Sequence, residues 1–351
     1  MSLTPISAVD ACARLDTFDA LIDARSPAEY ADDHLPGAVN WPVLDDDERR
    51  EVGTEYKQIS AFDARKHGAA IVARRVADIV ERHVQDKPRE WQPLVYCWRG
   101  GQRSGTLAWF LSQIGFRVQV LHGGYKAFRE QVREQLHTLP EHFDFTVVAG
   151  RTGSGKTRLL QALADAGAQV LDLEGLARHR GSVLGGLPHE PQPTQKAFDT
   201  AVWHALRGFD ASRPVFVESE SRKIGALAVP ERLLARMREH GRCVVVTLPD
   251  AARVQLLLEE YGFFAQQLDR FCAHMDTLAE LRGKQTVAHW QQLARAGQWA
   301  DVFAELMREH YDPLYQRSMN RNFAGLDAAR ELVLADGTPA SMQAAARQLL
   351  G

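Results

Sequence analysis

The chain has 351 residues, 45% hydrophobic and 25% charged, so it has room for two domains that each bury a core. Its formal net charge of −3 excludes a global attraction to phosphate backbones, and nucleic-acid binding would need a local basic patch. No stretch approaches the roughly 20 apolar residues of a membrane span, and the N-terminus lacks a signal-peptide pattern. We therefore expect a cytoplasmic protein without a membrane partner.

The first predicted elements are a helix and a strand. Ser7 is a typical N-cap for a helix that begins at the next residue, and residues 18–23 are typical of a strand. Asp23 and Arg25, at the end of that strand, are predicted to form an ion pair that braces the following loop. The mixed charges of residues 45–67 predict a solvated segment, and the apolar spacing of residues 69–84 predicts a helix.

A cysteine lies at the tip of the next predicted strand-to-helix loop. The loop reads Cys97-Trp98-Arg99-Gly100-Gly101-Gln102-Arg103-Ser104, and it follows the apolar run 94–96. Two glycines let the loop curl so that amide N–H groups converge on the sulfur, and Arg99 and Arg103 add positive charge. Such surroundings lower a thiol pKa below the free value of about 8.5 and favour the nucleophilic thiolate. The alternative is a small buried hydrophobic residue, which is how we interpret the other three cysteines, Cys12, Cys243 and Cys272.

A second motif follows the polar segment 135–142, which contains Pro140 and is predicted to be a linker. The strand-like residues 143–149 lead directly into Gly150-Arg151-Thr152-Gly153-Ser154-Gly155-Lys156-Thr157. This is a complete phosphate-binding loop: glycines bring amide N–H groups onto phosphate oxygens, Lys156 neutralises charge, and the Thr157 hydroxyl can hold a magnesium ion. A helix predicted at residues 158–166 supplies the structural context that the motif requires.

Carboxylates end a later buried strand, residues 214–218. In nucleotide hydrolases this position usually holds an aspartate that positions magnesium, but here it is Glu218, which weakens the case for a rapid ATPase. Glu218 could contact a metal or ligand, whereas Glu220 could equally form a salt bridge to Arg222 or Lys223. One further strand is expected at residues 243–248, and the chain is predicted to be helical from residue 251 to near its end. Locally basic segments supply candidate RNA contacts, although each residue is also explained as ordinary surface: Arg178, Arg180, Arg222, Lys223, Arg317 and Arg321.

Three segments in the expected order resemble the rhodanese family, namely residues 21–30, residues 34–40 and the Cys97 loop. Joined to the phosphate-binding loop, they make nearly the whole chain similar to the tRNA 2-selenouridine synthase family. The resemblance implies an α/β fold: a rhodanese-like α/β domain in residues 1–138, a P-loop NTPase-like α/β domain in residues 139–250, and its helical C-terminal extension in residues 251–351.

The resemblance also implies a reaction, the replacement of sulfur by selenium in 2-thiouridine at the tRNA wobble position. Enzymes of the family take selenium from selenophosphate, which selenophosphate synthetase could deliver directly. Their reaction passes through an S-geranylated intermediate made from geranyl diphosphate. Cys97 would be the nucleophile that carries or delivers selenium. Gly153, Gly155, Lys156 and Thr157 would bind either the diphosphate of the isoprenoid or the phosphate of selenophosphate.

No tightly bound cofactor is expected. The sequence leaves open whether Thr157 and Glu218 hold a magnesium ion. Two other functions fit the same motifs. One is an ATP-dependent kinase or ATPase with a fused rhodanese sulfur-carrier domain. The other is a non-catalytic persulfide carrier or RNA-binding module.

Overall fold

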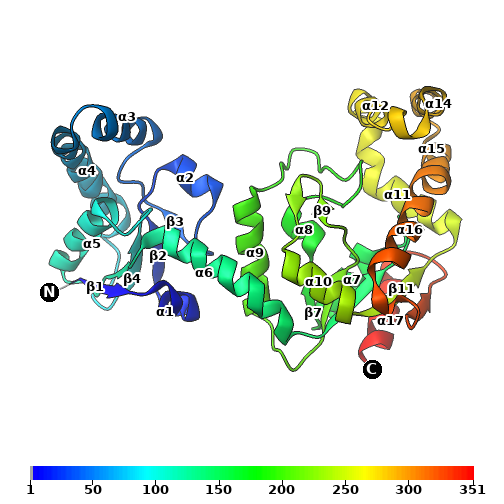
Figure 1. Ribbon diagram of the computed structural model, residues 1–351, viewed down its shortest axis with the longest axis horizontal. Helices are drawn as coiled ribbons and strands as arrows, with labels where there is room; N and C mark the ends of the chain where they lie inside the picture. The colour runs from blue at the N-terminus through cyan, green and yellow to red at the C-terminus, as the bar shows by residue number, and fades with distance from the viewer. Residues whose placement is uncertain (1–2) are drawn as a thin grey trace. The chain divides into compact units, whose positions relative to one another are not determined.

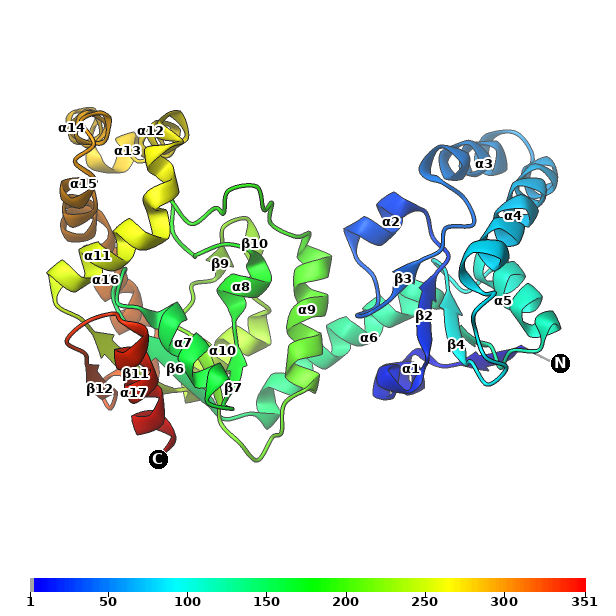
Figure 2. The same cartoon turned by 180° about the vertical axis from the view of Figure 1, so that it is seen from behind.

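The computed structural model describes residues 3–351, except the side chains of residues 318 and 320. The chain forms two compact units, and each contains a five-stranded parallel sheet (Figures 1 and 2). Unit 1 consists of Met1–Gln135 with Asp199–His204, and unit 2 consists of Leu136–Phe198 with Ala205–Gly351.

The sheet of unit 1 has the strand order β1-β5-β4-β2-β3, and every neighbouring pair is parallel. Parallel neighbours need crossover connections, which here are helical. The strands are β1 Thr4–Ile6, β2 Ala20–Asp23, β3 Val39–Asn40, β4 Pro93–Tyr96 and β5 Gln119–Leu121. The helices are α1 Ala8–Ala13, α2 Pro27–Asp32, α3 Asp46–Gln58, α4 Ala61–His83, α5 Gln102–Ile114 and α6 Gly124–Thr138.

The core on one face of this sheet combines strand residues with two helices. Ile22 of β2 and Val95 of β4 belong to the same buried cluster as Val76 of α4 and Leu107 of α5. Because side chains alternate along a strand, the intervening residues face the other side of the sheet. All four residues of β4 are buried, so the strand is packed on both faces of the sheet. Its C-terminal end leads directly into Cys97.

The sheet of unit 2 has the order β12-β11-β6-β8-β7, again entirely parallel, with β6 at its centre. Its strands are β6 Phe145–Ala149, β7 Gln169–Leu171, β8 Val215–Glu218, β11 Arg242–Thr247 and β12 Arg330–Val333, and a separate antiparallel pair is β9 Lys223–Ile224 with β10 Leu227–Ala228. The helices of unit 2 around it are α7 Lys156–Asp165, α8 Leu173–Ala177, α10 Glu231–His240 and α17 Pro339–Leu350, whereas the residues of α9 Gln195–Arg207 are divided between the two units. Leu159 of α7 and Met342 of α17 share one buried cluster with Val148 of β6.

A helical part is inserted between β11 and β12. It contains α11 Asp250–Tyr261, α12 Leu268–Asp276, α13 Ala279–Arg282, α14 Lys284–Arg295, α15 Trp299–Leu306, a π-helical turn Met307–Tyr311 and α16 Asp312–Asn322. The apolar stripe predicted as core is confirmed, because Phe271, Met275 and Trp290 are fully buried in one cluster of this part. None of the helices in residues 3–351 is long and apolar enough to cross a membrane.

Three local elements near the start of unit 1 agree at least in part with the sequence pattern. Ser7 caps α1, since its Oγ accepts a hydrogen bond from the Asp10 amide at 3.0 Å. The charges of the mixed-charge segment 45–67 lie on helices rather than in an irregular segment, namely on α3, which has no buried residue, and on the first turns of α4. The helix predicted at residues 69–84 is part of α4. This helix begins earlier than predicted, at Ala61, and Ser60 is its N-cap.

Residues 135–142, predicted to be a linker, contain the boundary between the two units at Gln135 and Leu136. They are helical, because α6 continues to Thr138 and a 3₁₀ helix, Leu139–His142, follows with Pro140 in its first turn, where proline is tolerated. The prediction of helix from residue 251 to near the end missed one strand, β12, which pairs with β11. Only Leu332 of β12 is buried, so its local pattern is too weak to predict a strand.

Candidate functional site

Cys97 follows β4 directly, and its side chain is only 3% exposed. Ser104, in the first turn of α5, donates a hydrogen bond from Oγ to Cys97 Sγ over 3.1 Å. The carbonyl of Cys97 accepts from the Tyr125 amide at 2.8 Å, and that of Trp98 accepts from the Lys126 amide at 3.0 Å. The loop that carries the thiol is therefore fastened at both its sulfur and its backbone.

Gly124 is part of this site, although the predicted site residues did not include it. Its φ is +60°, and a Cβ at this position would lie 2.2 Å from the Cys97 carbonyl oxygen and 2.5 Å from the Gly100 nitrogen. Only glycine permits this approach, because both the backbone conformation and the space exclude a side chain. The signal that could have identified it is the consecutive pair Gly123-Gly124 at the start of a helix.

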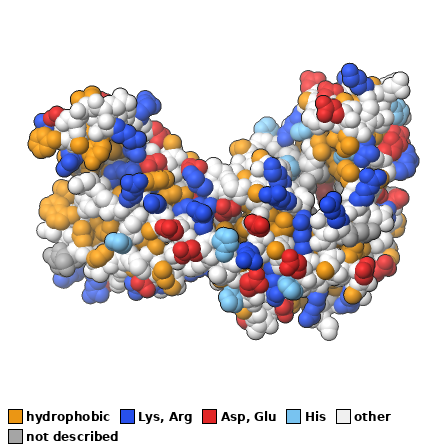
Figure 3. Space-filling model, in the orientation of Figure 1, with side chains coloured by type: hydrophobic (Ala, Val, Ile, Leu, Met, Phe, Trp, Pro, Cys, Tyr) orange, Lys and Arg blue, Asp and Glu red, His pale blue; other side chains and the backbone are white. Residues whose placement is uncertain are grey.

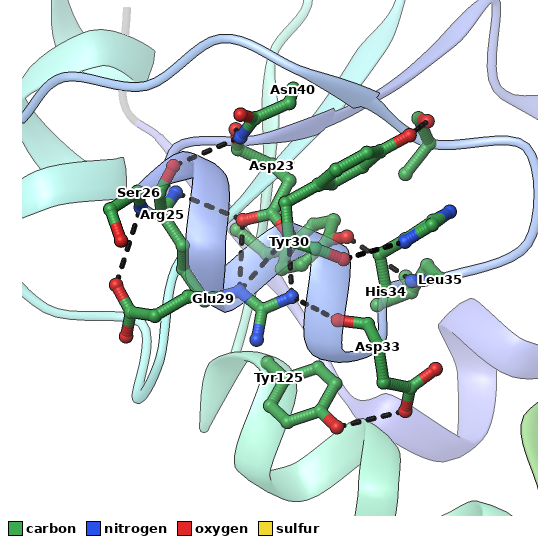
Figure 4. A network of polar contacts seen from close by, with 12 residues as sticks. Asp23, Arg25, Ser26, Glu29, Tyr30, Asp33, His34, Leu35, Asn40 and Tyr125 are labelled. Atoms are coloured by element: carbon green, nitrogen blue, oxygen red, sulfur yellow. Dashed lines mark hydrogen bonds and ion pairs between the residues drawn. The ribbon is translucent and has the colours of Figure 1, made fainter. Parts of the chain in front are cut away.

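The two arginines of the cysteine loop, Arg99 and Arg103, differ in their contacts and exposure. Arg103 donates from Nη1 to Glu29 Oε2 at 2.5 Å, so much of its charge is neutralised within the protein. Glu29 also accepts from the Ser26 amide, which completes a capping box at the start of α2 (Figure 4). Burial opposes ionisation of Glu29, but the hydrogen bond from Arg103 holds the pKa of this carboxyl below its usual value. Arg99 is exposed to solvent.

The predicted ion pair between Asp23 and Arg25 is confirmed, at 2.6 Å and with both side chains buried. Arg25 also donates to the Asp33 carbonyl at 2.6 Å, and its guanidinium carbon lies 3.9 Å from the centre of the Tyr125 ring. The Tyr125 hydroxyl in turn donates to Asp33 Oδ2 at 2.8 Å, and Figure 4 shows these groups gathered around the Arg25 side chain. Because the Tyr125 amide holds the Cys97 carbonyl, this network supports the cysteine loop.

The phosphate-binding loop runs from Gly150, directly after β6, to Thr157 in the first turn of α7. Gly153 and Gly155 have φ values of +76° and +80°, which require glycine. Lys156 donates from Nζ to the Gly150 carbonyl at 2.8 Å, and Thr157 donates from Oγ1 to Glu174 at 3.1 Å. The loop therefore has the conformation and side chains that the motif predicts.

A cavity of about 580 Å³ opens beside this loop. One part of its wall consists of the loop with the carboxylates of Glu174, Glu220 and Glu260. Further polar side chains line it as well: Arg158, Gln161, Arg180, Ser182, Ser219, Ser221 and His310. An apolar and aromatic part of the wall comes from the helical part: Leu257, Tyr261, Tyr311, Leu314, Tyr315 and Met319. Another hollow, of about 670 Å³, is lined by His189 and residues 266–270, which contain no phosphate-binding motif.

Glu218 is completely buried at the end of β8 and accepts a hydrogen bond from the Leu173 amide at 3.0 Å. Its Oε1 has no hydrogen-bond partner in the described part of the chain. Burial and the nearby carboxylates of Asp172 and Glu174 raise the pKa of Glu218 well above its usual value. Within residues 3–351, no group of three or more His, Cys, Asp or Glu side chains could hold a metal ion, so bound phosphates would have to complete any magnesium site.

Glu220 also differs from an ordinary surface carboxylate. Burial and the neighbouring Glu174 raise its pKa to about 8, and Lys156 partly offsets this effect. The predicted alternative, a salt bridge from Glu220 to Arg222 or Lys223, is not formed among the side chains that the structure describes. Glu220 lines the cavity beside the phosphate-binding loop instead.

The basic candidates do not form one site. Arg180 lines the cavity, donates to the Glu260 carbonyl at 2.5 Å and lies over the Tyr261 ring, which indicates a structural role. The remaining candidates are exposed: Arg178, Arg222, Lys223, Arg317 and Arg321. On the face drawn in Figure 3, Lys and Arg side chains are interspersed with acidic ones. Contact of these residues with tRNA stays a prediction.

The two halves of the chain match two family models, a rhodanese-like domain at residues 7–131 and the tRNA 2-selenouridine synthase AAA domain at residues 143–284. The tRNA 2-selenouridine synthase of a Sulfurovum species is 32% identical over 340 residues, which cover 86% of this chain and 89% of that protein. The chain belongs to the tRNA 2-selenouridine synthase family. The resemblance and the fold class predicted from the sequence are thereby confirmed.

Other proteins that bear this name match to different extents. The tRNA 2-selenouridine synthase of Hydrogenovibrio crunogenus is 32% identical over 334 residues, 88% of this chain and 91% of that protein. The tRNA 2-selenouridine synthase of Nitrosomonas europaea is 37% identical over 252 residues, 69% of this chain, and the match spans 63% of its length.

Proposed function

We propose that this protein is a transferase that replaces sulfur by selenium in 2-thiouridine at the wobble position of tRNA. The names of its relatives support tRNA as the substrate and selenouridine as the product. The proposal includes selenophosphate as the selenium donor, passed on by its synthetase, and a cytoplasmic location. The observation that carries it is a phosphate-binding loop beside a partly apolar cavity, in the same chain as a cysteine loop.

The phosphate-binding loop would serve a first step, the transfer of a geranyl group from geranyl diphosphate to the 2-thio sulfur. The sulfur attacks the allylic carbon, the carbon–oxygen bond breaks, and diphosphate leaves with the bonding electrons. Amide N–H groups of the loop and Lys156 would stabilise the departing diphosphate, which carries more charge than it does in the bound substrate. Thr157 and Glu218, whose Oε1 is buried without a partner, would hold a magnesium ion if one accompanies the diphosphate.

The apolar wall of the cavity supports an isoprenoid rather than a nucleotide as the donor. Leu257, Tyr261 and Tyr311 line both this cavity and a smaller hollow next to it, where Phe303 and Leu306 add further apolar surface. A ten-carbon chain would bury most of its surface in such surroundings, which favours binding by about 25 cal/mol per Å². The loop would then bind the diphosphate, and the aromatic side chains would bind the hydrocarbon.

The second step belongs to the cysteine loop. Cys97 is proposed as the nucleophile that delivers selenium, with Ser104 as the hydrogen-bond donor to its sulfur. Its thiolate would attack the phosphorus of selenophosphate, the phosphorus–selenium bond would break, and hydrogen selenide would be released at the loop. The selenide adds to C2 of the uridine, geranyl thiol leaves with the sulfur and a proton, and water then hydrolyses the S–P bond and regenerates the thiol.

The test is mass spectrometry of nucleosides from 2-thiouridine tRNA, incubated with the protein, geranyl diphosphate and selenophosphate. Wild type should produce both geranylated and selenated uridine. Lys156→Ala should lose the geranylated nucleoside, whereas Cys97→Ala should accumulate it without forming the selenated one. Unchanged tRNA under all conditions would contradict the proposal.

A kinase or ATPase activity is the alternative, and the complete phosphate-binding motif is the observation that favours it. Glu218 counts against it, because nucleotide hydrolases usually hold an aspartate, rather than a glutamate, at this position to place the magnesium ion. ATP turnover that depends on Lys156 and is unaffected by Cys97→Ala would establish this alternative.

A further inference from the structure

The guanidinium of Arg253, in α11, contacts the phosphate-binding loop and is 1% exposed. Its Nε and Nη2 both donate to the carbonyl oxygen of Thr152, at 2.9 and 2.7 Å. The same side chain makes two hydrogen bonds to the carboxylate of Asp312, the first residue of α16, at 3.0 and 2.6 Å, and one to Asp250 at 2.9 Å. Arg253 therefore connects the loop to helices that lie outside the eight-residue motif.

This connection determines how one peptide group of the loop is oriented. The peptide group between Thr152 and Gly153 is planar, and its C=O and N–H point in opposite directions. Because Arg253 holds the Thr152 carbonyl, the Gly153 N–H points away from the guanidinium of Arg253. Thr152 and Gly153 both line the cavity. Such amide N–H groups bind phosphate oxygens in loops of this type.

The packing around Gly153 restricts other arrangements. A Cβ on this residue would lie 3.0 Å from the Arg253 carbonyl oxygen and 3.2 Å from Leu257 Cγ, so α11 lies directly against it. At the start of the loop, the Gly150 amide donates to the Tyr315 hydroxyl at 2.5 Å, and Tyr315 belongs to α16. The start and the middle of the loop are thus anchored by the helical part.

We propose that Arg253 is a positioning residue for phosphate binding: together with Asp312, it orients the Gly153 N–H toward the ligand. The inference rests on the proposed function, because it takes the loop to be the binding site of a diphosphate. A merely structural role for the pair of buried Arg253 and partly exposed Asp312 would affect folding alone. Apolar residues often replace such a pair without loss of stability, which allows the two roles to be separated.

The experiment measures the affinity of the full-length protein for inorganic pyrophosphate by isothermal titration calorimetry, together with the thermal unfolding midpoint. Arg253→Met should bind pyrophosphate about tenfold more weakly and unfold at a lower temperature, since Asp312 then keeps only its half-exposed partner Arg151, at 3.1 Å. In Arg253→Met/Asp312→Leu the unfolding midpoint should recover, while the affinity stays about tenfold lower. Arg253→Lys should give an intermediate affinity, because an ammonium group donates to the Thr152 carbonyl without the two-pronged geometry.

A matched control is Arg236→Met, in α10. Arg236 also donates from Nε and Nη2 to a single backbone carbonyl, that of Phe143, at 3.3 Å for both, and it does not line the cavity. This variant should keep the wild-type affinity. If the double variant folds stably and binds pyrophosphate like wild type, the positioning role is wrong.

Lys156→Ala distinguishes that outcome from a failure of the proposed function. If Lys156→Ala abolishes pyrophosphate binding while the double variant retains it, only the role of Arg253 is rejected. If wild type does not bind pyrophosphate, or if Lys156→Ala binds it unchanged, the loop is not a diphosphate site and both proposals fall.

Discussion

The Ser104 hydroxyl donates a hydrogen bond to Cys97 Sγ within a buried site, where water cannot easily replace it. A hydrogen bond to a charged group contributes about 1.5–3 kcal/mol. Ser104→Ala should therefore slow the appearance of selenated uridine at least about tenfold, measured in a single turnover with geranylated tRNA. Ser112→Ala is the control, because the Ser112 hydroxyl donates to the Trp109 carbonyl of the same helix. Equal rates for Ser104→Ala and wild type would reject this role.

Gly124→Ala should inactivate the cysteine loop while leaving the phosphate-binding loop intact. Its Cβ would lie 2.2 Å from the Cys97 carbonyl oxygen, so the loop backbone must move. Selenation should be lost, whereas the affinity for pyrophosphate should be unchanged because that loop belongs to unit 2. Gly37→Ala is a matched control with φ +77° and no atom within 4 Å of the added Cβ, so it tests the backbone strain alone. Full selenation by Gly124→Ala would contradict the prediction.

Asp23→Asn should destabilise unit 1 strongly, because it leaves the buried guanidinium of Arg25 without its charged partner. Breaking a buried pair in this way costs about 3–5 kcal/mol. Urea unfolding followed by tryptophan fluorescence should show the loss. Arg50→Ala removes the exposed pair with Asp47 and should leave the transition unchanged. Similar unfolding curves for the two variants would show that the Arg25 network does not stabilise the fold.

His310 should make the stability of unit 2 depend on pH. Burial and then the charge of Arg282 lower the pKa of His310 from 6.5 to about 4, and its Nδ1 accepts a hydrogen bond from Arg282 Nε at 3.0 Å. Between these two pKa values the unfolded chain binds a proton that the folded chain does not, so stability falls as the pH drops from 6.5 toward 4. In His310→Gln, calorimetry should show a smaller decrease in the unfolding midpoint between pH 7 and pH 5. Parallel pH profiles would exclude this origin.

Both candidate loops could be predicted from the sequence because their essential residues are contiguous. In the phosphate-binding loop, Gly153 and Gly155 provide the φ values, and Lys156 and Thr157 follow directly. The strand before each loop and the helix after it are local patterns as well. The fold class followed from these strand–loop–helix units.

The residues that anchor the loops could not be predicted in this way. Arg253 contacts Thr152 from 101 positions later, and Tyr315 contacts Gly150 from 165 positions later, so no local spacing indicates either partner. Arg103 was interpreted as charge for the sulfur, but Glu29, 74 positions earlier, neutralises it. In each case the tertiary contact, rather than the motif, determines what the side chain does.

The insertion of the helical part between β11 and β12 bears on the order in which unit 2 folds. Val244 pairs with Arg330 only after the whole insertion has been looped out, and such long-range parallel pairing forms slowly. Neighbouring helices within the insertion make shorter-range contacts and can form earlier. Arg253 and Tyr315 belong to this insertion, so the phosphate-binding loop gains its anchors only when the insertion has docked on the sheet. Recovery of pyrophosphate binding during refolding would then mark one of the last steps, and the ligand would select fully assembled molecules.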